Sequence, residues 1–194
     1  MYDILKLLVL VLFKLVFCLE ISGQNNIPKK GSAIIASNHI SLLDPPVIGV
    51  SMPRYIHFMA KEELFKYPVF NWIITQLKAF PVRRGTADRT AIRTAINLLE
   101  SGAIVGLFPE GTRSKTGVLG KPEPGLALIA VKTGAPIIPT AVIGTGDFSK
   151  KLLPKFKVKF GKPIGVEKGK TDKESLEKIS QSLMQEIARL IKEG

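Results

Sequence analysis

A histidine and an aspartate stand five positions apart after a short apolar run, in the segment SNHISLLD at residues 37–44. Histidine titrates near neutral pH, and a carboxylate beside the ring can fix its tautomer and stabilise the imidazolium. The pair His39 and Asp44 could therefore act as a general base on a hydroxyl, which contributes about 10² to 10⁴ in rate. Two plainer interpretations stay open: Asp44 before Pro45 is also a suitable helix N-cap, and Asn38-His39 could be a simple turn.

A second polar segment, FPEGTRS at residues 108–114, directly follows another apolar run. In open α/β sheets ligands bind beyond the carboxyl ends of the strands, which is where this loop is expected. Gly111 permits close approach of the backbone to a ligand, and Arg113 offers a forked donor for phosphate or carboxylate. The alternative is a turn in which Glu110 and Arg113 are solvated surface charges.

The elements that must position these residues are short apolar runs that alternate with helical patterns. The apolar runs are continuous rather than alternating, which is typical of strands buried on both faces. We predict strands at 33–37, 55–60, 103–108 and 136–143, and helices at 87–102, at 125–132 and from Thr171 onward. The pattern predicts the α/β class, as a single domain with a central, mostly buried mixed sheet flanked by helices.

Helix ends are marked by particular residues. Gly102 and Gly134 are typical of carboxyl-terminal ends, and Thr171 with Glu174 stands in capping-box positions. The last helix is expected to bury one apolar face, formed by Leu176, Ile179, Leu183, Ile187 and Leu190.

Residues 4–19 are apolar except for Lys6 and Lys14. A signal peptide is disfavoured because bulky residues stand where the cleavage site needs small ones. A spanning helix of this length rises only about 24 Å against a hydrocarbon core of roughly 30 Å, and the cost of two lysines nearly cancels the apolar gain. The pattern favours a helix in the membrane interface or partly inserted, with its lysines at the headgroups. A buried amphipathic helix of a soluble domain is the alternative.

The aromatic segment 65–74 mixes Trp72 and Tyr67 with phenylalanine and lysine, as membrane-interface segments do, although aromatic residues are equally common in ordinary cores. We divide the chain into an N-terminal membrane-associating helix at 1–22 and one domain at 23–194.

Lysine and arginine outnumber aspartate and glutamate by 28 to 16, which favours anionic partners such as phosphates, acidic lipids or acidic carrier proteins. Nucleic acid fits the charge equally well, but no known nucleic-acid-binding motif accompanies it, so we expect no nucleic-acid partner. The single cysteine, Cys18, allows no intrachain disulfide, and the scattered histidines have no zinc-ligand spacing. We expect no metal and no cofactor.

The motifs resemble those of the glycerolipid acyltransferases, and most closely those of the 1-acylglycerol-3-phosphate acyltransferases. NHISLLD at 38–44 is similar to the family's Asn-His-(four residues)-Asp motif, and FPEGTRS to its second signature. Two further blocks occur in the family's order, FPVRRG at 80–85 between the signatures and APIIP at 135–139 after them.

The resemblance implies that His39 is the catalytic base and that Asp44 orients it. It also implies that Lys61, Arg84 and Arg113 bind phosphate. Asn38, Glu110, Gly111 and Thr112 would form the rest of the substrate site. One departure from the family pattern is Arg83, where an aspartate is common, and it leaves the acceptor headgroup in doubt.

The resemblance further implies transfer of an acyl group from acyl-ACP (acyl carrier protein) or acyl-CoA to the sn-2 hydroxyl of lysophosphatidic acid, giving phosphatidic acid. His39 would take the proton, and backbone donors near Gly111 could stabilise the oxyanion. The expected location is the cell membrane, with the active site facing the cytoplasm. Glycerol-3-phosphate or another lysolipid is an alternative acceptor, and a basic lipid-binding protein without activity is the non-enzymatic alternative.

Overall fold

The structure is a computed structural model and describes residues 2–76, 78–83, 88–147, 154–169 and 171–194. Its helices are α1 (Tyr2–Phe17), α2 (Asp44–Ser51), α3 (Pro68–Gln76), α4 (Arg89–Glu100), α5 (Pro124–Thr133) and α6 (Lys173–Lys192). Its strands are β1 (Glu20–Ser22), β2 (Ala33–Ser37), β3 (Ile56–Lys61), β4 (Phe80–Val82), β5 (Ile104–Leu107), β6 (Ile137–Ile143) and β7 (Lys157–Phe160). Short 3₁₀ turns are η1 (Gln24–Asn26), η2 (Glu62–Lys66) and η3 (Thr145–Asp147).

Within the described residues the strands form one sheet in the order β1-β7-β6-β2-β5-β3-β4. All neighbouring strands are parallel except β6 and β7, which are antiparallel. The four predicted strands are confirmed as β2, β3, β5 and β6, and the predicted mixed α/β sheet is confirmed with them. The short strands β1, β4 and β7 were not predicted.

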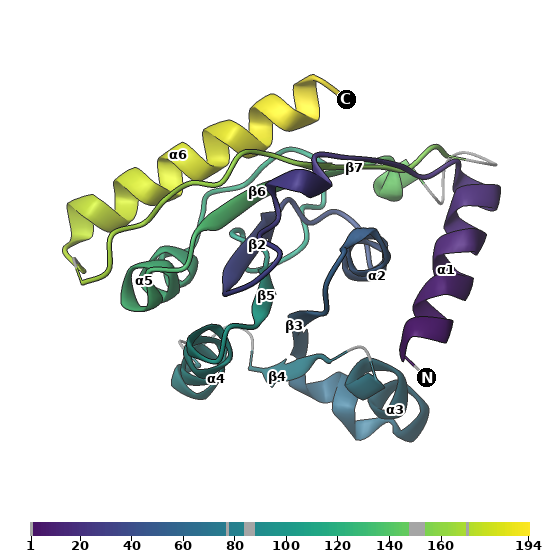
Figure 1. Cartoon of the computed structure of the whole chain (residues 1–194), viewed down its shortest axis with the longest axis horizontal. Helices are drawn as coiled ribbons and strands as arrows, with labels where there is room; N and C mark the ends of the chain where they lie inside the picture. Colours follow the sequence, from purple (N-terminus) through teal and green to yellow (C-terminus); the bar gives the residue numbers. More distant parts are fainter. Residues whose placement is uncertain (1, 77, 84–87, 148–153, 170) are drawn as a thin grey trace.

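Helices cover both faces of the sheet (Figure 1), with α1 and α2 on one side and α4, α5 and α6 on the other. Alternate residues of β2 serve the two sides: Ile35 packs with α1 and α2, whereas Ile34 and Ala36 pack with the other three helices. This alternation follows from the two-residue period of a strand and explains why every residue of β2 is buried. The continuous apolar pattern of the central strands thus reflects cover on both faces.

One predicted helix end differs from the structure and another agrees with it. Asp172, rather than Thr171, caps α6, because its carboxylate accepts the N–H of Ser175 at 2.9 Å. The predicted capping box of Thr171 and Glu174 was therefore wrong by one residue. Gly134 ends α5 with φ +70° as expected, a conformation that favours glycine.

Helix α1 lies against α2, and its inner face contributes the buried Phe13 to the core. Lys6 does not reach outward as predicted: its ammonium group donates to the carbonyl of Met52 at 2.5 Å, just past the end of α2. Such carbonyls at a helix end have no partner within the helix, so a lysine is a favourable donor there. None of the helices in the described part of the chain combines the length and apolar character needed to cross a bilayer.

Candidate active site

Three neighbouring parallel strands end at the same edge of the sheet, and each is followed by part of the site. His39 follows β2, the loop that begins at Phe108 follows β5, and Thr145 follows β6. Parallel strands place their carboxyl ends together, so the topology brings these distant segments to one place.

The imidazole of His39 and the carboxylate of Asp44 are in contact, with Nδ1 and Oδ2 2.8 Å apart. The side chains are 5% and 0% exposed. An ionised carboxylate only accepts hydrogen bonds, so Nδ1 carries the proton and Nε2 is left as the basic nitrogen. In the residues that the structure describes, Nε2 has no hydrogen-bond partner. The pair is therefore arranged as a carboxylate-oriented general base would be.

Asp44 does not act as the helix N-cap that the sequence allowed. Its Oδ2 points back along the chain and accepts the N–H groups of Ile40 and Ser41 at 2.7 and 2.8 Å. Its Oδ1 accepts the hydroxyl of Thr145 at 2.5 Å, across 101 positions of sequence. Thr145 is buried and was not predicted to belong to the site. Four donors thus hold a carboxylate that is fully shielded from water, which fixes its orientation toward His39.

Phe108 supports the other side of the imidazole. Its ring stacks on that of His39 with centroids 3.9 Å apart and planes 16° apart. The sequence placed Phe108 in the second signature but gave no sign of this role. The stacked ring and the carboxylate together leave the imidazole little freedom to rotate.

Asn38 extends the pairing of β2 with β6 through its side chain. Its amide donates to the carbonyl of Val142 at 2.8 Å, and its oxygen accepts the N–H of Val142 at 2.8 Å. The substrate-binding role of Asn38 stays a prediction, since both ends of its amide are used by the backbone here.

Glu110 connects the signature loop to the base. Its Oε1 accepts the N–H of His39 at 3.4 Å, and its Oε2 accepts the N–H of Gly120 at 2.7 Å. Glu110 is 8% exposed, so its carboxylate links the backbone of His39 to that of Gly120 rather than facing solvent as a free charge. The solvated-turn interpretation is therefore wrong for Glu110, although Arg113 is exposed.

The loop encloses a groove of about 380 Å³. Its lining combines polar, aliphatic and charged residues, and consists of Glu110, Thr112, Arg113, Ser114, Thr116, Val118, Leu119, Gly120 and Lys121. Arg113 and Lys121 are both exposed, and neither forms an ion pair within the described residues. Lys121 was not singled out in the sequence, because no motif marks it. Two unpaired cations in one groove suit a phosphate ligand.

His39 does not line this groove. A backbone hydrogen bond connects them, because the N–H of Ser114, a lining residue, donates to the carbonyl of His39 at 2.7 Å. The N–H of Gly111 donates to the carbonyl of Phe108 at 3.0 Å. Gly111 has φ +66°, which explains the glycine, and its own amide is engaged by Phe108; an oxyanion donor near Gly111 stays a prediction.

Lys61, one of the predicted phosphate-binding residues, is not among the residues that line this groove. Lys61 ends β3, is exposed, and pairs with Glu63 at 3.2 Å. Arg84 lies outside the described residues, so its role remains a prediction. In the described residues no group of three or more histidine, cysteine, aspartate or glutamate side chains could hold a metal ion.

Comparison of the sequence with models of known protein families identifies the family of this chain. The sequence model described as Acyltransferase matches residues 18–143, which include both signatures. The chain belongs to this acyltransferase family.

Named relatives lie within the same family. The 1-acyl-sn-glycerol-3-phosphate acyltransferase of Bacillus subtilis (strain 168) is 36% identical over 148 residues, covering 75% of this chain and 73% of the relative. The enzyme of that name from Borreliella burgdorferi is 32% identical over 66% of this chain and 52% of the relative. The chain thus spans only about half of some relatives that it matches.

A solved structure has the same fold. The crystal structure of the 1-acyl-sn-glycerophosphate (LPA) acyltransferase PlsC from Thermotoga maritima superposes with a TM-score of 0.71 at 30% identity. The match covers 95% of this chain and 80% of that chain. The predicted family resemblance is confirmed.

Proposed function

We propose that the chain transfers a fatty acyl group from an acyl thioester to the sn-2 hydroxyl of lysophosphatidic acid, which yields phosphatidic acid. The observation that carries the proposal is the buried contact of His39 and Asp44, 2.8 Å long, in a chain whose named relatives are 1-acyl-sn-glycerol-3-phosphate acyltransferases. The donor is acyl-ACP or acyl-CoA, and no metal or cofactor takes part.

In the proposed reaction, Nε2 of His39 takes the proton of the acceptor hydroxyl while its oxygen attacks the thioester carbonyl. The carbon–oxygen bond forms and the carbon–sulfur bond breaks, and the proton then passes from the imidazolium to the departing thiolate. The products are an ester and a free thiol, and no acyl-enzyme is needed. Asp44 stabilises the imidazolium, because its carboxylate is 0% exposed and lies against Nδ1.

The acceptor phosphate binds Arg113 and Lys121 in the groove of the signature loop. Holding the phosphate converts an encounter of two molecules into an oriented attack. Lys61 and Arg84 supply further positive charge for the acceptor headgroup, as the family resemblance implies, and Asn38, Glu110, Gly111 and Thr112 shape the substrate site.

The enzyme acts at the cell membrane, with its active site facing the cytoplasm, and α1 rests in the bilayer interface. This part of the proposal is supported by a row of exposed apolar side chains on the outer face of α1, namely Ile4, Leu7, Leu8, Val11, Leu12 and Leu15. Soluble monomers rarely expose so many together. Tyr67 and Trp72 are also exposed, which favours the membrane-interface interpretation over burial for these two residues.

A thiol-release assay with purified protein, lysophosphatidic acid and an acyl thioester tests the activity. His39→Ala should lower turnover by about 10² to 10⁴, the usual contribution of a general base. His57→Ala removes the other histidine of the chain and should leave turnover unchanged. Equal turnover in wild type and His39→Ala would exclude His39 as the general base. The same assay with glycerol-3-phosphate in place of lysophosphatidic acid tests the alternative acceptor.

The proposed binding of α1 to the membrane is tested by sedimentation of the protein with anionic vesicles. Leu8→Glu/Leu15→Glu should release the protein from vesicles, because it places two charges on the apolar face. Gln181→Glu/Gln185→Glu adds the same charge at exposed polar positions of α6 and should stay bound. Identical binding of both variants would contradict an interfacial α1.

A further inference from the structure

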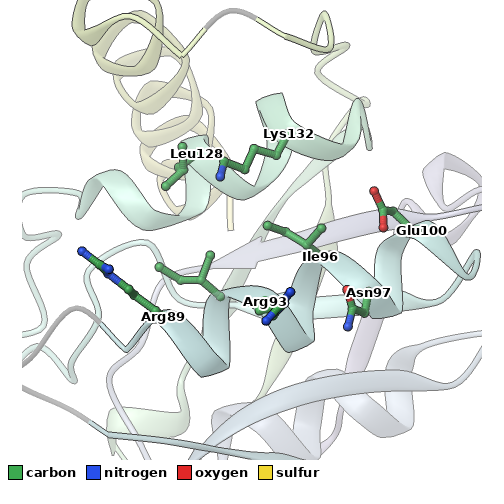
Figure 2. Close-up of a pocket in the computed structure, with 8 residues that line it drawn as sticks. Arg89, Arg93, Ile96, Asn97, Glu100, Leu128 and Lys132 are labelled. Atoms are coloured by element: carbon green, nitrogen blue, oxygen red, sulfur yellow. The ribbon is translucent and has the colours of Figure 1, made fainter.

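A second and larger groove lies away from the candidate active site, between α4 and α5, with a volume of about 610 Å³. Figure 2 shows the two helices running side by side, with Ile96 on one and Leu128 and Lys132 on the other. The mechanism above uses none of the residues that line this groove.

Three cations border the groove: Arg89 and Arg93 from α4, and Lys132 from α5. All three are exposed, and none forms an ion pair or hydrogen bond with another residue that the structure describes. The floor is aliphatic, formed by the half-buried Ile92, Ile96 and Leu128. We call this surface the cationic groove. An apolar floor with a charged rim is the usual composition of a protein interface.

The charge is unevenly distributed along the cationic groove. Arg89 is the first residue of α4, and Glu100, the one acidic residue in the lining, is the last. Helix α4 leads into the start of β5, and β5 pairs in parallel with β2, the strand that His39 follows. The helix therefore runs opposite to these strands. The first turn of α4 therefore lies at the same edge of the sheet as His39. Arg89 and Arg93 thus place two positive charges toward the end nearer the chemistry, whereas Glu100 lies at the far end, together with Lys132 from the last turn of α5.

The cationic groove also faces away from the proposed membrane contact. Helices α4 and α5 cover the face of the sheet opposite to α1 (Figure 1). If the outer face of α1 rests on a bilayer, the groove is directed to the aqueous side. A recessed aliphatic floor between two helices also suits a convex protein element better than a flat lipid surface.

We infer that the cationic groove docks an acidic amphipathic helix of the carrier protein that presents the acyl thioester. The inference rests on the proposed function and deepens it, since it selects a carrier protein rather than coenzyme A as the donor. Carboxylates of such a helix pair with the guanidinium forks of Arg89 and Arg93, and its apolar side chains cover Ile92 and Ile96. Coenzyme A is a poorer occupant, because none of the described residues that line the groove is an aromatic one on which its adenine could stack.

Donor kinetics with Arg89→Glu/Arg93→Glu test the inference. Acyl-ACP and acyl-CoA are compared in the thiol-release assay with lysophosphatidic acid. The variant should raise KM for acyl-ACP by at least about tenfold, because like charges now face each other across the interface. The kinetics with acyl-CoA should stay unchanged. The matched control is Lys162→Glu/Lys178→Glu, which makes the same change in net charge at exposed positions outside the groove.

A direct binding measurement separates this inference from the proposed function. Fluorescence anisotropy with labelled acyl carrier protein should show weaker binding for the groove variant and unchanged binding for the control, whether or not the preparation turns over. Equal kinetic losses with both donors, equal carrier binding by all three proteins, or loss of vesicle binding by the groove variant alone would overturn the inference. Absent turnover with either donor, together with intact carrier binding, would refute the proposed function and not the docking surface.

Discussion

The hydroxyl of Thr145 should determine how firmly the catalytic carboxylate is held. Thr145→Val keeps the shape of the side chain but removes the donor that lies 2.5 Å from Oδ1 of Asp44. The other three donors to Asp44 all reach Oδ2, so Oδ1 would lose the one bond described for it. Asp44 is 0% exposed, so bulk solvent does not reach its carboxylate to replace the lost donor. A hydrogen bond to a buried charged group contributes about 1.5–3 kcal/mol.

We therefore expect Thr145→Val to lower the free energy of unfolding by about 2 kcal/mol in urea titrations. The same hydrogen bond helps Asp44 to stabilise the imidazolium in the transition state. A loss of about 1.4 kcal/mol of that stabilisation lowers kcat about tenfold with little change in KM. Thr145→Ser retains the donor and should restore kcat. Wild-type stability and turnover in Thr145→Val would refute the reasoning, and a loss of stability with unchanged kcat would show that Thr145 supports the fold without positioning the base.

Two further predictions concern other parts of the structure. Asp88 caps α4 by accepting the N–H groups of Thr90 and Ala91 at 2.9 and 3.0 Å. Asp88→Ala should cost about 1 kcal/mol of stability in urea titrations and Asp88→Asn much less, whereas equal losses would contradict a cap. Burial lowers the pKa of His57 from its ordinary value of 6.5, so the folded protein binds the proton less readily than the unfolded chain. Stability should fall as the pH drops through 6.5 toward the lower folded pKa, and His57→Gln should flatten that dependence; an unchanged slope would exclude His57 as its source.

The central part of the fold was predictable because its strands are long apolar runs. β2, β3, β5 and β6 lie within one or two residues of their predicted bounds, since burial on both faces leaves an unbroken apolar signal. The three-residue strands β1 and β4 carry too few residues for such a signal, and β7, although as long as β5, is not a continuous apolar run. β7 alternates buried and half-buried side chains, and its period of two in KVKF was the one local sign available.

The candidate site was predictable only where its residues are near neighbours in sequence. His39 and Asp44 are five positions apart, and a motif of that spacing can bring the two side chains together. The contacts of Thr145 and of the ring of Phe108 depend on how β2, β5 and β6 are ordered in the sheet, which no local pattern encodes. The direction of Lys6 was wrong for a similar reason, because its partner is the carbonyl of Met52 at the end of another helix.

The carboxamide of Asn38 has a consequence for which amino acids can stand beside the base. The carboxamide donates one hydrogen bond to the backbone of Val142 in β6 and accepts another from it. It thus makes the two hydrogen bonds that a backbone peptide group would make in the next position of the sheet. Aspartate is the same size but cannot donate when ionised, and leucine has neither group. The requirement for asparagine here thus follows from its hydrogen bonds to β6, so the sheet itself can specify a residue of a catalytic signature.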